Sequence, residues 1–318
     1  MVELTHNFKI SMKTKKPYDF QLTVHKPAGW NLFSSGEIYE NGTLWTALYI
    51  GDELTGVKLY SSGDKHAPII TAEVFTKSSS NSAFKRLAKD DLTSKLSVDE
   101  DLGGFYALAK EDKILSYTIK DLYGMHNTDD ASLFSIALLT ITLQMAPLKR
   151  SQEMLEAIVK NYGETAEFDD RRIMLTPSPK IIAKLNPRTL KSRCNLGYRA
   201  KFIVQLAKVI EKGFPSLEEL RKFSAAEAKK KLLGLPGIGD YSADIINPGG
   251  GFPIDVWSAD VFGKLFYGEE PENGRDAIER IKAEGLRRWG EWSWYAFFYV
   301  VNDLENLSKK LGTTLRLQ

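Results

Sequence analysis

The first part of the chain alternates apolar and polar residues over several short stretches. Between His6 and about Thr76 the segments FKISM, FQLTVHK, TLWTALYI and GVKLY show this alternation, and turn-forming pairs such as Lys-Pro, Asn-Gly and Gly-Asp separate them. Because successive side chains of a strand point to opposite faces, such a pattern is typical of strands with one buried face. The segment therefore predicts an antiparallel sheet built from these stretches.

After the polar tract KSSSNS the apolar residues take up helical spacing, beginning with a weak apolar face of Phe84, Leu87, Leu92 and Leu96. Most of the remaining chain continues in this way, so the fold class is α+β, with an N-terminal antiparallel β domain followed by helices. We predict helices, with ends good to a few residues, near residues 104–112, 114–124, 131–145, 149–162, 178–185, 196–212, 216–222, 225–233, 240–246, 258–267, 274–288 and 290–310.

The composition limits the classes of protein that fit. The 318 residues can bury a sizeable core and suggest two or three subdomains. A net charge of +2 predicts no polyanion partner by itself, so an argument for nucleic acid depends on where the charges lie. The single cysteine, Cys194, excludes an internal disulfide framework and a thiolate cluster, and four scattered histidines make a zinc site improbable. We expect no metal.

Nothing in the sequence predicts export or membrane insertion. The start VELTHNFKI lacks the basic and apolar regions of a signal peptide. The most apolar run, Ala131–Pro147, is about 17 residues long and contains Ser, Thr and Gln, which is short for a membrane span. We expect an intracellular protein, in the cytoplasm or nucleoid or in a nucleus, with this run as a buried helix.

The stretch LLGLPGIGDYSADIINPGGGFPID (Leu232–Asp255) is rich in helix-breaking residues. Ala225–Leu233 is a strong helix former, Gly234 can end that helix, and LPGIG allows only a tight turn. Asp240 is a natural N-cap for a second helix, Tyr241–Ile246. The residues alone thus predict a helix, a hairpin and a helix.

The hairpin suits a phosphate group. Glycines at 237 and 239 let the main chain approach another group closely, and Ile238 would anchor the turn in the core. A plain loop is the alternative. Positive charge gathers near this turn, at Lys229, Lys230, Lys231, Arg193, Arg199 and Lys201, although a solvated helix face explains at least some of these residues equally well.

Several segments in order resemble one family. LPGIGDYSADI followed by FPIDVWSADVF resembles the helix-hairpin-helix and Gly/Pro/Asp signature of the DNA glycosylase superfamily, whose members excise damaged or mismatched bases. SLFSIALLTITLQMAPLKRSQEMLEAIVKNYG is similar to its first core helix pair, NLGYRAKFIVQLAKVI to a segment of the 8-oxoguanine branch, and WGEWSWYAFFYVVND to its late aromatic helix. The resemblance covers roughly residues 101–305, and the β domain matches in kind that of the 8-oxoguanine and 3-methyladenine II branches.

The resemblance implies a domain division and a DNA-binding surface. Residues 1–100 would be the β-sheet domain, 101–130 with 252–318 a helical subdomain lining the base pocket, and 131–251 a helical subdomain with the helix-hairpin-helix at 224–246. The partner would be double-stranded DNA with a damaged base, bound by a monomer without a required cofactor, or with a monovalent cation at the hairpin backbone. The DNA-binding residues would be Leu235, Gly237, Ile238, Gly239, Lys231, Arg199 and Lys201.

Asp255 is the candidate catalytic residue. Cleavage of an N-glycosidic bond builds positive charge on the sugar of the flipped nucleotide, and a nearby carboxylate stabilises that charge or orients water. The resemblance places the family's catalytic aspartate at this position; the alternative is that Asp255 only caps the helix that follows. Asp244 and Asp260 are expected to be structural or surface carboxylates.

Tyr241 occupies the position that divides the family by mechanism. A lysine there attacks the sugar, forms a Schiff base and adds strand cleavage, whereas a phenol forms no imine. The resemblance therefore implies a monofunctional glycosylase that uses water, with lyase activity unlikely.

The damaged base is less well defined. An aromatic wall would suit alkylated purines through cation–π attraction, and the candidate pocket residues are Tyr241, Trp257, Trp289 and Trp292. Several tryptophans and tyrosines of residues 289–299 recur at helical spacing, so ordinary core packing is the alternative. Alkylated purines such as 3-methyladenine or 7-methylguanine are the first hypothesis, 8-oxoguanine the second, and a non-catalytic DNA-binding protein the alternative of another class.

Two further expectations follow from the resemblance. Gln144 and Met145 fall where the family inserts a side chain into the gap left by the flipped base, and an unbranched Met is a plausible wedge, with core packing as the alternative. The spacing from Tyr241 to Asp255 is about one helical turn shorter than usual, with Pro248–Gly251 ending the helix early. The loop beneath the pocket should therefore differ, which affects base specificity more than reaction type.

Overall fold

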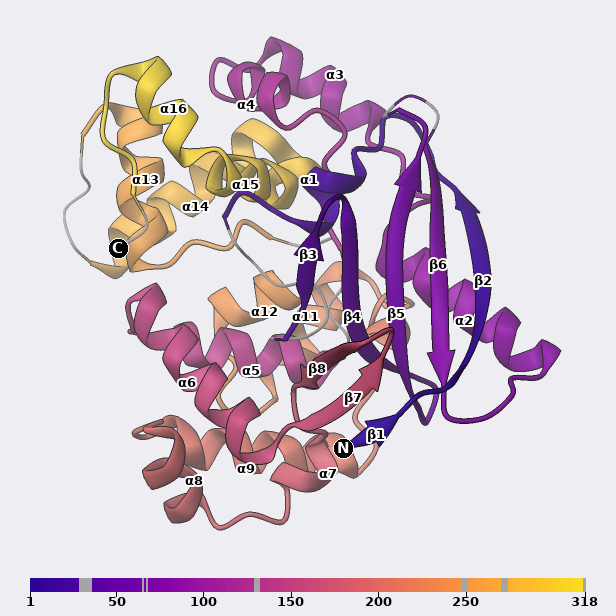
Figure 1. Cartoon of the computed structure of the whole chain (residues 1–318). Coiled ribbons are helices and arrows are strands. Elements are labelled where there is room, and N and C mark those ends of the chain that lie inside the picture. Colours follow the sequence, from indigo (N-terminus) through magenta and orange to yellow (C-terminus); the bar gives the residue numbers. More distant parts are fainter. Residues whose placement is uncertain are drawn as a thin grey trace.

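The structure is a computed structural model, and it describes residues 1–28, 36–64, 66, 68–128, 132–247, 251–269 and 274–316. Two sheets lie at one side of a large set of helices, and in Figure 1 the helices form an upper and a lower group. The N-terminal antiparallel sheet followed by helices confirms the predicted α+β class.

The larger sheet has five strands in the order β2-β6-β5-β4-β3, all antiparallel. Alternating side chains, among them Leu48, Val57 and Val74, are fully buried on the face that helix α2 covers with Leu92. The alternation read from the sequence is therefore the inward face of this sheet. The elements are β2 (His6–Lys13), β3 (Ile38–Glu40), β4 (Thr43–Ile50), β5 (Glu53–Ser62), β6 (Ile69–Thr76) and α2 (Ser82–Lys95).

One alternating stretch is not a strand. FQLTVHK contains helix α1 (Phe20–Val24) instead. The Asp19 carboxylate accepts a hydrogen bond from the main-chain N–H of Leu22 at 3.0 Å, and the Thr23 hydroxyl donates to the Asp19 carbonyl at 2.6 Å. These local bonds start a helical turn despite the strand-like pattern, so the strand prediction was wrong and the N-cap Asp19 was the signal against it.

A second, three-stranded sheet was not predicted. Strands β7 (Glu164–Phe168) and β8 (Arg171–Leu175) form a hairpin, and β1 (Val2–Glu3) pairs with β7 in parallel. The turn is Asp169–Asp170, both in the left-handed region with φ of +48° and +56°, a conformation that Asp tolerates. Segment 131–251 is therefore not helical throughout, because its residues 164–175 alternate and pack their apolar face on the larger sheet.

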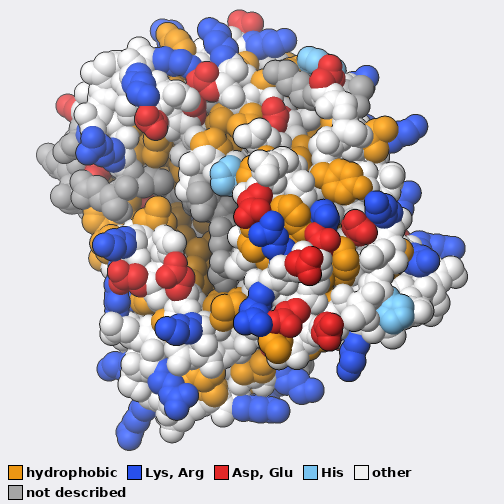
Figure 2. Space-filling view, viewed as in Figure 1, with side chains coloured by type: hydrophobic (Ala, Val, Ile, Leu, Met, Phe, Trp, Pro, Cys, Tyr) orange, Lys and Arg blue, Asp and Glu red, His pale blue; other side chains and the backbone are white. Residues whose placement is uncertain are grey.

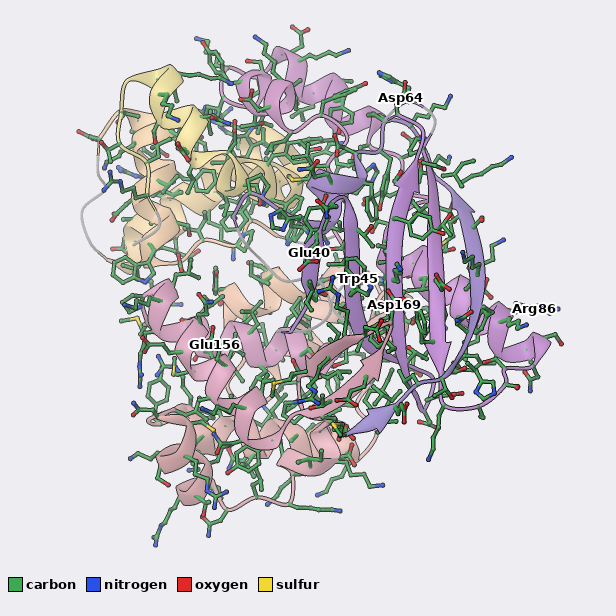
Figure 3. The ribbon with its side chains drawn as sticks, in the orientation of Figure 1. Glu40, Trp45, Asp64, Arg86, Glu156 and Asp169 are labelled. Atoms are coloured by element: carbon green, nitrogen blue, oxygen red, sulfur yellow. The ribbon has the colours of Figure 1, made fainter. Side chains whose placement is uncertain are left out.

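Asp169 fixes this hairpin to the larger sheet. Its carboxylate accepts hydrogen bonds from the Trp45 indole N–H at 2.7 Å and from the Lys58 ammonium at 2.8 Å, and Figure 3 shows Trp45 and Asp169 side by side with Glu40 nearby. Although burial acts in the opposite direction, these donors hold the pKa of Asp169 below its ordinary value. The contact joins the β domain to the segment that carries the lower helices.

Each predicted helix has a counterpart in the structure, but one of them is divided and a further helix was not predicted. Helix α8 was missed although Asn186 caps it and Pro187 begins it, which are typical start signals. The helix predicted at 290–310 is interrupted after Trp292 and again at Asp303. No helix in the described ranges is long and apolar enough to cross a membrane. The helices are α3 (Gly103–Glu111), α4 (Leu115–Asp121), α5 (Leu133–Leu143), α6 (Leu148–Tyr162), α7 (Pro179–Ile182), α8 (Pro187–Cys194), α9 (Arg199–Glu211), α10 (Leu217–Leu220), α11 (Ala225–Leu233), α12 (Asp240–Ile246), α13 (Val256–Tyr267), α14 (Arg275–Trp289), the short 3-10 helix Gly290–Trp292, α15 (Ser293–Asn302) and α16 (Leu304–Leu311).

The helices bury their apolar faces in two clusters. We call the one built mainly from α3, α4 and α13–α16 the C-terminal cluster, and the one built from α5–α12 the hairpin cluster. Helix α12 contributes to both, because Ile245 belongs to the C-terminal cluster and Ala243 and Ile246 to the hairpin cluster. The two clusters agree in outline with the two helical subdomains suggested by the sequence, whose boundaries stay a prediction. Helix α12 lies where the two helical groups meet.

Candidate functional site

The helix, hairpin and helix predicted from the sequence are present with the predicted bounds, α11 before the turn and α12 after it. A capping box of Ser224 and Glu227 begins α11. Helix α12 is capped by Gly239, not by Asp240, since Asp240 is already helical and pairs with Lys229 at 3.0 Å. The short turn thus brings both helices together with little chain between them.

The apolar residues of the turn pack into the hairpin cluster. Leu235 and Ile238 are buried, at 3% and 7% exposure, and the N–H of Ile238 donates to the Leu235 carbonyl at 3.2 Å. Gly237 has φ +80°, and a side chain there would lie 2.9 Å from Cβ of Phe202, so only glycine fits. Gly239 faces open space. Leu235 and Ile238 therefore anchor the hairpin in the core, as expected of Ile238, and only main-chain groups of these two residues remain for a ligand.

The turn between α5 and α6 carries the two residues predicted as wedge. Met145 is 79% exposed and has a left-handed backbone with φ +48°. Core packing, the alternative for this methionine, is therefore wrong. Gln144 is half-buried, and its side-chain amide donates to the Gly237 carbonyl at 2.6 Å. The two neighbours thus do different things, one projecting outward and one holding the hairpin.

Arg199 differs from its predicted role as a DNA-binding residue. It is 8% exposed, its Nε donates to the Ile141 carbonyl at 3.2 Å, and its Nη2 donates to the Gln144 carbonyl. These carbonyls end α5 and need a donor, so the guanidinium closes that helix end. Lys201 and Lys231 are exposed as expected, the latter over the ring of Phe223.

A basic pocket beside the α5–α6 turn was not predicted. It has a volume of about 450 Å³, and Arg150, Arg188, Lys191 and Arg199 contribute its charges. Figure 2 shows Lys and Arg side chains over this lower part of the molecule, and a hollow lined partly by hydrophobic side chains between it and the sheet. Arg188 and Lys191 share helix α8, whereas Arg150 belongs to α6, so the fold brings Arg150 to a basic segment that is otherwise continuous in the sequence.

Asp255 combines a structural contact with an open oxygen. It is the N-cap of α13, where its Oδ1 accepts from the main-chain N–H of Ser258 at 2.8 Å and from the Ser258 hydroxyl at 2.7 Å. The side chain is half-buried, and its hydrogen bonds to described residues all use Oδ1. The capping interpretation is therefore correct, and it leaves one carboxylate oxygen for chemistry.

Tyr241 lies within electrostatic reach of that carboxylate. Burial first, and the charge of Asp255 second, raise the pKa of the Tyr241 phenol well above its ordinary value. The phenol is accordingly neutral at physiological pH. Tyr241 packs on the C-terminal cluster from the first turn of α12, so the helix after the hairpin brings this phenol near enough to the N-cap of α13 for an electrostatic interaction.

The predicted aromatic pocket is only partly supported by the side-chain positions. Trp289 is 1% exposed, packs edge-on against Phe252 and Phe262, and donates its indole N–H to Asp112 at 2.9 Å. The prediction that Trp289 lines the pocket was wrong, because its helical spacing places it on the buried face of α14. Trp292 is half-buried against Phe105, and Trp257 is half-buried on the first turn of α13; their roles stay predictions.

Asp244 links the two helical groups. It is fully buried, pairs with Lys229 of α11 at 2.8 Å, and pairs with Lys282 of α14. Gly251 packs directly on it, because a side chain at that glycine would lie 2.4 Å from the carboxylate. Asp244 is therefore structural, as expected. The predicted helix-ending loop Pro248–Gly250 lies outside the described residues.

The described residues contain no group of three or more His, Cys, Asp or Glu side chains that could hold a metal ion. What the arrangement offers is a carboxylate with one open oxygen, a neutral phenol beside it, an open glycine turn, and an exposed methionine on a turn fixed to that hairpin.

Comparison with known proteins gives relatives of one kind. No protein-family profile matches the sequence. The chain is 26% identical over 208 residues to a DNA-3-methyladenine glycosylase of Bacillus subtilis, covering 64% of this chain and 67% of that protein. It is 24% identical over 226 residues to a probable N-glycosylase/DNA lyase of Methanothermobacter thermautotrophicus, covering 64% of this chain and 70% of that protein.

Solved structures share the fold over nearly the whole chain. The 3-methyladenine DNA glycosylase of Archaeoglobus fulgidus matches with a TM-score of 0.73 and 18% identity, over 96% of this chain and 100% of that one. An 8-oxoguanine glycosylase/lyase of Clostridium acetobutylicum, in complex with double-stranded DNA containing cytosine opposite 8-oxoguanine, matches with a TM-score of 0.71 and 16% identity, over 95% and 98%. The names of the sequence relatives and the shared fold together confirm the resemblance to DNA glycosylases.

Proposed function

We propose that this chain, which resembles the helix-hairpin-helix DNA glycosylases in sequence and in fold, hydrolyses the N-glycosidic bond of a flipped damaged purine in double-stranded DNA. It would act in base excision repair. The observation that carries the proposal is that the Asp255 carboxylate interacts electrostatically with the phenol of Tyr241 on α12, the helix that follows the hairpin and contributes to both helical clusters. Relatives by sequence are named for the same reaction type.

Asp255 is the catalytic carboxylate of this proposal. Its Oδ1 is occupied by the start of α13, and this contact fixes the orientation of the open Oδ2. An oriented carboxylate in a partly desolvated site stabilises the positive charge that develops on the sugar, or aligns the attacking water. The N-glycosidic bond breaks and the base leaves with its electron pair, while water adds its hydroxyl to the sugar carbon and releases its proton to solvent or to the departing base.

Tyr241 supports hydrolysis without strand cleavage. The phenol has no amine to form an imine with the sugar carbon, and its raised pKa keeps it neutral beside Asp255. We therefore propose a monofunctional enzyme with water as the nucleophile. The sequence relative named as an N-glycosylase/DNA lyase is the reason to test this point directly.

DNA binding would use the exposed features around this pair. Met145 would fill the gap left by the flipped base, because it is an unbranched, exposed side chain on a turn held to the hairpin. The hairpin turn, which is open at Gly239, would hold a phosphate through its main chain, and exposed Lys201 and Lys231 would add charge. A monovalent cation at the hairpin backbone, a monomeric state and an intracellular location complete the proposal.

Alkylated purines, such as 3-methyladenine and 7-methylguanine, are the proposed substrates. The Bacillus relative named for 3-methyladenine has the higher identity, and half-buried Trp257 and Trp292 are the aromatic residues left for a cationic base. Oxidised purines such as 8-oxoguanine are the second candidate, favoured by the fold shared with the Clostridium enzyme.

The experiment is a comparison of matched duplexes that differ in one base. Release of free base is measured from duplexes with 3-methyladenine, 7-methylguanine or 8-oxoguanine. Release from the methylated duplexes and not from the oxidised one is expected. The opposite result overturns the substrate proposal, and tight duplex binding with no release from any of them would favour a non-catalytic DNA-binding protein.

A further inference from the structure

Three parts of the proposed DNA surface meet at Gln144: the end of α5, the hairpin, and the start of α9. Its amide nitrogen donates to the Gly237 carbonyl at 2.6 Å and lies 3.4 Å from the hydroxyl of buried Ser242 on α12. Its own main-chain carbonyl accepts from Arg199 of α9. One side chain and its backbone thus connect segments about 50 and 90 residues away.

The backbone of the next residue, Met145, directs its side chain into solvent. Met145 has φ +48°, which is costly for a residue with a side chain and persists only where the surroundings fix it. The fixing contacts are the hydrogen bonds of Arg199 to the Ile141 and Gln144 carbonyls, and that of the Ala146 N–H to the Leu143 carbonyl at 3.4 Å. The exposed direction of Met145 therefore depends on bonds that also involve Gln144.

The hairpin end of this connection is equally constrained. The carbonyl that accepts from Gln144 belongs to Gly237, whose backbone is left-handed and packed against Phe202 and Ile141. The next peptide N–H, of Ile238, is turned to the Leu235 carbonyl. A shift of the Gln144 amide would therefore move the peptide that orients the turn, and a shift of the turn would move the base of Met145.

We propose that Gln144 is a positioning residue that couples insertion of Met145 into DNA to the hold of the hairpin on the DNA backbone. This rests on the proposed function and assigns Gln144 a role different from the wedge role expected from the sequence. Its amide is already engaged and half-buried, whereas the methionine beside it is free to enter the duplex.

The test is a double-mutant cycle in the full-length protein. Gln144→Met keeps the length of the side chain and removes the donor, and Met145→Ala removes the wedge. Gln144→Asn keeps the amide but shortens the side chain, and it is the second variant should Gln144→Met fold poorly. Gln205→Met, the same replacement on the exposed side of α9, is the control. The readouts are fluorescence of the base analogue aminopurine when it leaves the stack, single-turnover base release, duplex affinity and melting temperature.

We expect Gln144→Met to lower base flipping about threefold to tenfold, because the variant loses one hydrogen bond to a partly buried carbonyl. Met145→Ala should then cost much less in this background than in the wild type, because the wedge is already misplaced. The control should change neither quantity. Strictly additive effects, or a loss of flipping that only follows a lower melting temperature, would overturn the coupling.

Failure of this inference is distinguishable from failure of the proposed function. If the wild type releases no base from any duplex, the proposed function fails, and the fluorescence cycle still tests the coupling because it measures base flipping and needs no bond cleavage; a wild type that binds DNA without flipping a base overturns the coupling as well. If bases are released normally and the cycle is additive, only the coupling fails.

Discussion

Asp255→Asn separates the two roles that the structure gives to this side chain. An asparagine retains the oxygen that accepts from the Ser258 N–H and hydroxyl, and Asn caps a helix about as well as Asp. The free energy of unfolding should therefore change by less than about 0.5 kcal/mol. The negative charge is lost, and with it the stabilisation of the charge that develops on the sugar.

The expected cost in rate is large. Removing one oriented electrostatic stabiliser from an active site lowers the rate of the chemical step about 10²- to 10³-fold. Duplex affinity should stay the same or increase, because a carboxylate near phosphates repels them. Single-turnover base release, duplex binding and thermal unfolding measured on the same preparation give all three quantities.

Asp255→Ala is the matched comparison. It removes the cap as well as the charge, so it should lose about 1 kcal/mol of stability and about 2 °C of melting temperature beyond Asp255→Asn, while the rate falls equally. Ser224→Ala, which removes the cap of α11 away from the carboxylate, should show the stability loss without the rate loss. An unchanged rate in folded Asp255→Asn would refute the role of the charge.

Four further predictions follow. Tyr241→Lys should give a covalent product with DNA on borohydride reduction, which the wild type should not; no trapped product would mean that an amine at this position does not reach the sugar. Met145→Ala should lower base flipping at least tenfold with little effect on affinity for undamaged duplex, and Leu148→Ala, also exposed, should not; equal effects would contradict the wedge. Asp244→Ala should lower the free energy of unfolding by about 3 kcal/mol in denaturant titration, because two lysines lose a fully buried partner; a change below about 1 kcal/mol would contradict the link between the helical groups. Burial raises the pKa of Asp303 to about 6 from 3.8, so the folded state binds the proton more tightly than the unfolded chain, and the free energy of unfolding falls as pH rises through that range. Asp303→Asn should therefore become more stable than the wild type as pH rises from 3.8 to about 6, and the difference should remain at higher pH. Free energies of unfolding that change with pH in parallel for the two proteins would exclude this.

The local parts of the site were predictable from the sequence. Ser224, Gly234, Gly237 and Gly239 set helix ends and a tight turn through their own backbone preferences, so α11 and α12 have the predicted bounds. Caps and glycines act over a few residues, and a single sequence contains them in full. The same kind of signal, in Asn186 before Pro187, was present for α8 and was overlooked.

The parts that depend on tertiary contacts were not predictable. Arg199 is a basic residue in a basic stretch, and only its contact with the end of α5 shows that its charge faces inward. Trp289 fits an aromatic pocket and a core equally well by spacing, and its bond to Asp112 decides for the core. FQLTVHK is different, because it alternates like a strand but a local signal, the N-cap Asp19, begins a helix there.

The most direct measurement of the central claim is product analysis of a single-turnover reaction on a duplex with one 7-methylguanine. Hydrolysis that depends on Asp255 predicts free 7-methylguanine and an abasic strand that stays intact until it is treated with alkali, with both products lost in Asp255→Asn. A strand that is cleaved without alkali, or a free base released at the same rate by Asp255→Asn, would contradict it.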